Sequence, residues 1–100
     1  MTEGSENQEL SSGMAAFEAK NFSLAMQFLS PLAEAGDMVA QHRVAIMCQN
    51  GLGVVRNEAR ALAMMQAAAE QGLAIAQHGI GFMYLEGDCV AQDSAAAVKW

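Results

Sequence analysis

Two ten-residue stretches decide the fold: AEAGDMVAQH at residues 33–42 and AEQGLAIAQH at residues 69–78. They lie 36 residues apart, and extending the alignment to residues 33–64 and 69–100 gives 11 identities in 32 pairs without a gap. Unrelated sequences would share roughly two or three residues over that length, so an internal repeat explains the match better. The chain is therefore predicted to consist of repeated structural units.

Each unit is predicted to contain two helices. Residues 38–49 carry apolar side chains at helical rather than alternating spacing. Gly51 ends this helix, because glycine readily adopts the left-handed conformation of a helix end. Asn57 is the predicted N-cap of a second helix over residues 58–71, which ends before Gly72. The unit is thus a helix, a glycine-containing loop and a second helix.

The second copy repeats this order, with a helix over residues 73–85, a cap at Asp93 and a helix from Ser94 onward. Trp100 falls where this last helix is only half built, and the helix is about two turns shorter than its counterpart. The unit over residues 73–100 is therefore predicted to be truncated in its second helix, as in a fragment of a longer array.

The residues before the repeat are predicted to form a divergent first helix pair over residues 10–36, with helices over residues 10–19 and 22–35. Pro31 lies inside the second of these, where it lacks a donor and crowds the preceding turn, so we expect a kink or a local break there. Residues 1–9 are polar and acidic and are predicted to be a disordered tail.

Composition points to an all-α protein. Apolar residues make up 53% of the 100 residues and aromatic residues only 6%, while alanine occupies 20 positions and methionine 8. Sandwiches and barrels favour β-branched and aromatic residues, and disordered chains are less apolar. Alanine favours helices and methionine fills irregular gaps between them, so helices packed closely together are expected.

The net charge, the lengths of the apolar runs and the N-terminal sequence limit which partners and which cellular location are expected. The net charge is −6, and five scattered bases cannot neutralise a run of phosphates, so no nucleic-acid binding is expected. No apolar run approaches the roughly 18 residues of a membrane-spanning helix, and no secretory signal is visible. Two cysteines are too few for a disulfide scaffold. The predicted location is cytoplasmic, or secreted or periplasmic if a leader was removed.

The glycines, alanines and loop length agree together in two copies, and this pattern resembles the Sel-one-like repeat, a relative of the tetratricopeptide repeat. The matching segments are Ala33-Glu34, Gly36, Ala40-Gln41, Gly51-Leu52-Gly53-Val54, Ala69-Glu70-Gln71-Gly72, Ala76-Gln77, Ile80-Gly81, Met83-Tyr84, Gly87, Val90, Asp93 and Lys99-Trp100. Cys48 stands where the family has tyrosine. The resemblance implies a right-handed α-solenoid of antiparallel helix pairs, a tetratricopeptide-like superhelix of about two and a half repeats spanning residues 10–100, with a full repeat over residues 37–72.

The resemblance also implies a non-enzymatic interaction or adaptor module, whose first helices line a concave surface. A solenoid buries each unit against the next and leaves such a surface free for a partner peptide or helix. The predicted partner-binding residues are Val39, His42, Ile46, Gln49, Ile75, His78, Phe82 and Leu85. Two alternatives are a structural segment of a larger scaffold with binding elsewhere, and a β-lactam-binding hydrolase. Self-association through the incomplete last helix, with Trp100, Phe82 and Leu85 buried against a second molecule, is a further expectation.

Two histidines and two cysteines are candidates for metal binding, a disulfide or catalysis. His42 and His78 occupy equivalent positions and could line a groove or bind a metal, but zinc needs about four ligands, so no metal site is predicted. Cys48 is expected to be a buried core thiol, and Cys89 replaces a loop glycine and should be more exposed. A Cys48–Cys89 bridge stays open as a minor alternative. Neither cysteine adjoins a base, so no catalytic residue and no cofactor are predicted.

The remaining candidates have both a functional and a structural interpretation. Glu86 and Asp88 form a small acidic loop that could bind a cation or act as acid and base, although solvated loop residues are the simpler interpretation. The methionines could form an adaptable partner surface, but helical spacing favours a place in the core. They are Met14, Met26, Met38, Met47, Met64, Met65 and Met83.

Overall fold

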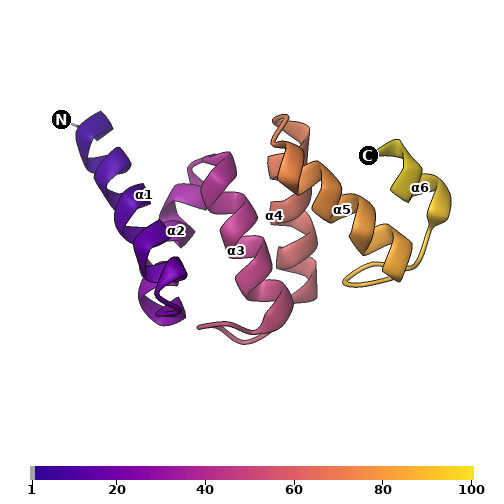
Figure 1. Ribbon diagram of the computed structural model, residues 1–100, viewed down its shortest axis with the longest axis horizontal. Helices are drawn as coiled ribbons and strands as arrows, with labels where there is room; N and C mark the ends of the chain where they lie inside the picture. The colour runs from indigo at the N-terminus through magenta and orange to yellow at the C-terminus, as the bar shows by residue number, and fades with distance from the viewer. Residues whose placement is uncertain (1) are drawn as a thin grey trace.

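The architecture is a row of helix pairs. The structure is a computed structural model that describes residues 2–100, with side chains from Gln8 onward. In that range the chain forms six α-helices and no β-strand (Figure 1), which confirms the all-α prediction. The helices are α1 (Thr2–Glu18), α2 (Phe22–Glu34), α3 (Met38–Asn50), α4 (Glu58–Glu70), α5 (Ala74–Glu86) and α6 (Ser94–Lys99).

The pairs α1/α2, α3/α4 and α5/α6 follow one another along the long axis of the molecule (Figure 1). The molecule measures 44 × 26 × 19 Å, so it is elongated in the direction of stacking. Each helix contacts the next one in the chain, as expected where helix pairs cover one another's apolar faces. The predicted solenoid of about two and a half repeats is confirmed. Among the described helices, none is both long and apolar enough to cross a lipid bilayer.

Local sequence signals set the ends of the helices. Asn57 and Asp93 cap α4 and α6 as predicted, because each side-chain oxygen accepts a backbone N–H three residues on, at 3.0 and 3.1 Å. Gly51 and Gly87 follow α3 and α5 in the left-handed conformation, with φ of 69° and 71°. The two repeats therefore end their first helices and begin their second helices by the same devices, whereas α3 is capped by the side chain of Asp37 and α5 begins after Leu73 without a side-chain cap.

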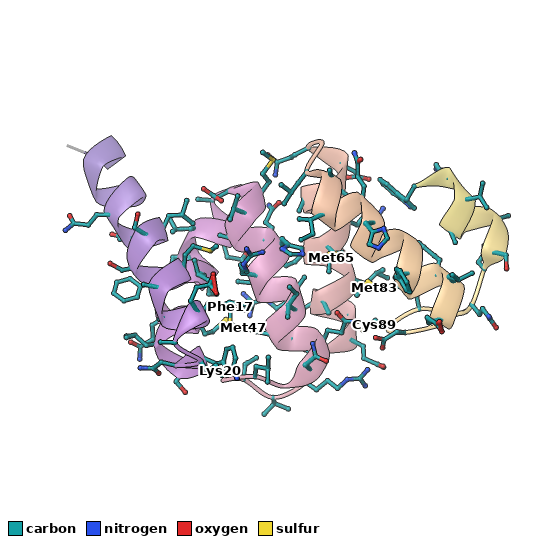
Figure 2. All side chains as sticks on the ribbon, in the orientation of Figure 1. Phe17, Lys20, Met47, Met65, Met83 and Cys89 are labelled. Carbon is teal, nitrogen blue, oxygen red and sulfur yellow. The ribbon has the colours of Figure 1, made fainter. Side chains whose placement is uncertain are left out.

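The core runs through all three pairs and is built largely from small and flexible side chains. Ala40 and Ala76 are both 0% exposed, so equivalent positions of the repeat lie in equivalent surroundings. Six of the seven methionines belong to the core or pack against it, which confirms the prediction for them: Met47, Met65 and Met83 are buried, and Met26, Met38 and Met64 are half-buried against the core. Met14 is half-buried outside this cluster. Figure 2 shows Met47, Met65 and Met83 along the middle of the molecule. The largest fully buried side chains are Leu29, Val44, Met47, Cys48, Ile80 and Met83.

The first helix begins earlier than the sequence suggested. We expected a disordered tail over residues 1–9 and a helix from Leu10, but α1 extends back to Thr2. Met1 lies outside the described residues. Adding a residue to an existing helix costs far less than starting one, so a helix anchored by Leu10 and Gly13 against α2 can continue into polar sequence.

Pro31 does not break α2, which runs without interruption from Phe22 to Glu34. Its missing N–H deprives the carbonyl of Gln27 of a partner. Both residues are exposed, so water can satisfy that carbonyl. Leu29, Leu32 and Ala33 on the opposite face are buried, and this packing holds the helix together past the proline.

Candidate functional site

The candidate site is a pocket of about 330 Å³ between α3 and α5. His42 and Ile46 line it from α3, and Ile75 and Phe82 line it from α5. Met65 of α4, which is 3% exposed, contributes the thioether that Gly79 approaches closely. The first helices of two consecutive repeats therefore form the walls, and the second helix between them contributes a buried side chain. We call this the α3–α5 pocket. Its remaining lining residues are Gln49, His78, Gly79, Met83, Glu86 and Asp88.

His42 is the buried polar group of the pocket, at 4% exposure. Burial and the neighbouring positive charge of Arg43 lower the pKa of His42 from 6.5 to about 4, so the ring is neutral near pH 7. Arg43 Nη1 hydrogen-bonds His42 Nδ1. A guanidinium can only donate, so Nδ1 accepts and the ring proton lies on Nε2. His42 is thus a neutral side chain with an N–H donor on Nε2.

His78 occupies the equivalent position in the next repeat and has different surroundings. It is exposed, and its ring meets that of Phe82 edge to face, with centroids 5.0 Å apart and planes at 64°. Phe82 is 50% exposed and Ile75 is 54% exposed. The α5 wall is therefore an apolar and aromatic surface open to solvent.

The loop end of the pocket is polar. Gln49 Nε2 donates to Asp88 Oδ2 and thereby ties the end of α3 to the loop after α5. Arg56 Nη2 bonds Asp88 Oδ1 at 3.0 Å, and Arg56 Nη1 bonds Glu58 at 2.9 Å. One arginine thus links two carboxylates that belong to different repeats.

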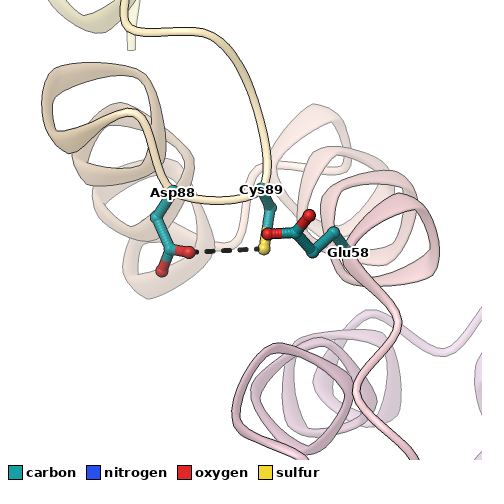
Figure 3. A group of neighbouring side chains, drawn as sticks. All are labelled: Glu58, Asp88 and Cys89. Atoms are coloured by element: carbon teal, nitrogen blue, oxygen red, sulfur yellow. Dashed lines mark hydrogen bonds between the residues drawn. The ribbon is translucent and has the colours of Figure 1, made fainter.

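Cys89 stands beside the same two carboxylates (Figure 3). Ligand atoms of Glu58, Asp88 and Cys89 lie within 4.8 Å of one another, a spacing compatible with a metal ion. Burial, and then the charge of Asp88, raise the pKa of the Cys89 thiol to about 11, and Sγ donates to Asp88 Oδ1 at 3.6 Å. A protonated thiol is a poor ligand and Arg56 already pairs with both carboxylates, so this group is better explained as an ion-pair cluster.

The pocket brings together six of the eight predicted partner-binding residues. Val39 is half-buried and lines neither this pocket nor its neighbour. Leu85 is exposed and lines a second pocket of about 340 Å³, beside Trp100 and Val98. Sequence reasoning missed Met65, and it noted Glu86 and Asp88 without assigning them to the groove. The available signal for Glu86 was its place in the repeat, because Glu86 is the last residue of α5 and corresponds to Asn50, the last residue of α3 and the neighbour of the predicted Gln49.

The two cysteines differ in exposure as expected. Cys48 is fully buried, which confirms a core thiol. Cys89 is half-buried and therefore more exposed than Cys48, as expected, and its side chain lies beside Glu58 at the start of α4. Both are free, so the alternative of a bridge between them is wrong for this structure.

Comparison with known proteins now identifies the repeat. The Sel1 repeat matches residues 16–37, 39–73 and 74–100. This chain belongs to the Sel1 repeat family. The second and third matches coincide with the pairs α3/α4 and α5/α6, and the first covers α2 and only the last residues of α1.

Two solved structures share the fold. A Sel1 repeat protein from Oxalobacter formigenes is 32% identical, with a TM-score of 0.86 over 92% of this chain. A protective antigen present in uropathogenic Escherichia coli strains, which displays an SLR fold, is 27% identical, with a TM-score of 0.90 over 99% of this chain. The chain covers only 37% and 22% of these two proteins. No curated protein sequence matches it at a significant level.

Sel1 repeats are in general protein–protein interaction scaffolds rather than enzymes. Of the 11 positions that are identical between residues 33–64 and 69–100, six are alanine or glycine.

Proposed function

We propose that this Sel1 repeat protein is a non-enzymatic interaction module that holds a peptide or helix of a partner protein in the α3–α5 pocket. The observation that carries the proposal is that half-exposed Ile75 and Phe82 form an apolar wall of this pocket. Covering apolar surface stabilises a complex by about 25 cal/mol per Å², and aromatic side chains often supply the largest share. A partner side chain that contacts Met65 would thus be held mainly by burial.

The chemistry of the pocket supports binding over catalysis. Cys89 has a raised pKa and donates to Asp88, so it is held as the unreactive thiol. Cys48 is fully buried. A hydrolase of the β-lactam-binding type needs a nucleophile with an adjacent base, and the lining of the α3–α5 pocket offers no serine, threonine or cysteine.

A second candidate function is a structural segment of a larger repeat scaffold. The observation in its favour is the pocket beside α6, where Leu85 is 46% exposed and Val98 is 86% exposed. Apolar faces of this kind are covered by the next helix pair in a longer solenoid, and both structural relatives are longer than this chain. The same face could instead bury against a second molecule, as the sequence led us to expect.

A peptide selection tests the first proposal. A displayed peptide library is selected on the immobilised protein, and the enriched peptides are measured by fluorescence anisotropy. Phe82→Asp places a charge in the apolar wall and should weaken binding at least about tenfold, because it removes aromatic burial and adds a desolvation penalty. Val55→Asp is the matched control, since Val55 is 86% exposed and lines neither pocket. Equal binding by the two variants would reject the pocket as the binding site.

A further inference from the structure

The segments formed by the last residue of α3 or α5 and the loop that follows it differ sharply in charge, although they occupy the same place in the repeat. Residues 50–57 (NGLGVVRN) contain one charged side chain, Arg56, for a net charge of +1. Residues 86–93 (EGDCVAQD) contain three carboxylates and no base, for a net charge of −3. Only this second segment contributes charged side chains to the α3–α5 pocket, through Glu86 and Asp88. The loop end of the pocket is therefore acidic.

The helix ends add to this negative charge. Arg56 Nε donates to the carbonyl of Gln49 at 2.7 Å and so places a cation at the end of α3. At the equivalent position Gln92 Nε2 donates to the carbonyl of Leu85 at 2.8 Å, which caps α5 with a neutral amide. Neither helix has a basic residue in its last turn. The C-terminal end of a helix dipole is negative, so the end of α5 is left without a compensating cation.

Asp88 and Glu86 contribute differently to the acidic end. Asp88 is already paired with Arg56 and Gln49. Glu86 is exposed, lines the pocket and makes no hydrogen bond or ion pair with the side chains that the structure describes. It is thus the carboxylate that can receive a charged group from outside.

His42 is a second and independent feature of the same pocket. Its side chain is buried to more than nine tenths, and Nδ1 is occupied by Arg43. Over residues 8–100, no other side chain or backbone group bonds its Nε2, although the ring lines the pocket. Arg43 Nε, and not His42 Nε2, is the fully buried side-chain nitrogen without a partner among the described residues, so Nε2 is accessible and can donate to an acceptor in the pocket, such as a peptide carbonyl.

We propose that the occupant of the α3–α5 pocket is a basic amphipathic peptide segment. Its apolar side chain lies against Met65 and Phe82, a backbone carbonyl accepts from His42 Nε2, and a lysine or arginine pairs with Glu86. This inference rests on the proposed function, because it names the class of partner that the same pocket takes. An acidic segment is disfavoured, since it would meet Glu86 and the uncompensated end of α5.

Three synthetic peptides test the charge preference. They share one amphipathic leucine and alanine pattern and differ only at four polar positions, which are all lysine, all glutamine or all glutamate. Fluorescence anisotropy of the labelled peptides is measured at 50 mM and 500 mM NaCl. We expect the lysine peptide to bind at least about tenfold more tightly than the glutamate peptide at low salt, and this ratio to fall at high salt.

A pair of charge-matched variants separates the pocket from the overall negative charge. Glu86→Gln and Glu18→Gln remove the same charge, but Glu18 lies at the end of α1 and lines no described pocket. Glu86→Gln should weaken binding of the lysine peptide about fivefold and leave the glutamine peptide unchanged. Glu18→Gln should change either by less than about twofold.

The outcomes distinguish this inference from the function on which it rests. Equal binding of lysine and glutamate peptides, with both lost in Phe82→Asp, would overturn the charge preference and leave the pocket as a binding site. Equal effects of Glu86→Gln and Glu18→Gln would also overturn it, because attraction would then be non-specific. If none of the three peptides bound, both the inference and the proposed function would be rejected.

Discussion

Helices α3 and α5 occupy the same position in consecutive repeats, yet one is enclosed and the other is open. His42 on α3 is 4% exposed, whereas His78 on α5 is exposed. Helix α3 lies between two other helix pairs, and its Arg43 lies over the ring of Phe17 in α1 at 5.4 Å. Helix α5 has a complete pair on one side only. The environment of a repeat position is thus decided by its stacked neighbours and not by the residue type.

The loops show the same contrast at the level of the backbone. A Cβ on Gly53 would lie 2.4 Å from the backbone carbonyl carbon of Phe22, so the loop after α3 presses directly on the start of α2. The equivalent residue after α5 is Cys89, which carries a side chain and has φ of 66°. It faces Glu58, the counterpart of Phe22. The first inter-repeat junction is closed by backbone contact and the second by an ion-pair cluster.

The largest expected effect on stability comes from adding a side chain at Gly53, where the loop after α3 contacts the start of α2. Gly53→Ala should lower the free energy of unfolding by about 3 kcal/mol, because the new Cβ overlaps the Phe22 backbone and the residue must keep φ of 70°. Urea denaturation measures the change. Gly36→Ala is the control, since its φ is 105° but nothing lies within 4 Å of the added Cβ. A loss no larger in Gly53→Ala than in Gly36→Ala would show that the junction is not tight.

Protonating His42 should lower the free energy of unfolding by a smaller amount, on the order of 2 kcal/mol after allowing for solvent in the pocket. Its folded-state pKa, about 4, lies below its ordinary value of 6.5, so the unfolded state binds the proton more readily. The stability contributed by this residue is therefore complete above pH 6.5 and is lost as the pH falls toward 4. Urea unfolding from pH 7.5 to 4 should show a shallower loss in His42→Gln than in the natural sequence.

His78→Gln serves as the matched control for that experiment, because it makes the same change at the equivalent, exposed position. The charged and titratable groups that face His42 or line the same pocket are Arg43, His78, Glu86 and Asp88, and each variant changes one histidine and leaves the other groups in place. If His78→Gln flattened the profile as much as His42→Gln, the contrast between the two histidines would be wrong.

The smallest effect on stability comes from replacing Cys89, at the second inter-repeat junction, with the glycine that stands at the equivalent position of the first. Cys89→Gly should raise the free energy of unfolding by about 0.5–1 kcal/mol, because glycine adopts φ near 66° without strain. The added flexibility of the unfolded chain opposes this gain. Thermal unfolding with Cys48 left in place measures the change, and a clear loss of stability would mean that the contact of Cys89 with Asp88 outweighs the strain.

Much of the fold could be predicted because its signals are local. The observed bounds of α3 and α4 differ from the predicted ones by about one residue, and the caps at Asn57 and Asp93 were foreseen. These features depend on side chains three or four residues from the backbone groups they serve. The start of α1 and the continuity of α2 through Pro31 were not foreseen, because packing against neighbouring helices overrides local propensity.

The candidate site divides in the same way. The repeat register placed His42 and His78 on the same face, and both line the α3–α5 pocket. Burial of His42, the contribution of Met65 and the ion pair of Arg56 with Asp88 depend on contacts between residues far apart in the chain. No periodicity within one repeat reports such contacts.

By itself the sequence determined the repeat, the helix pairs and the ends of most helices, since hydrogen bonding and side-chain spacing act within a few residues. Only the tertiary structure decided which of two equivalent histidines is buried, which loop contacts the backbone of the preceding helix pair, and which carboxylates line the pocket. Those properties arise when one pair stacks on another, because burial, close approach and charge pairing are set by the whole neighbourhood of a residue.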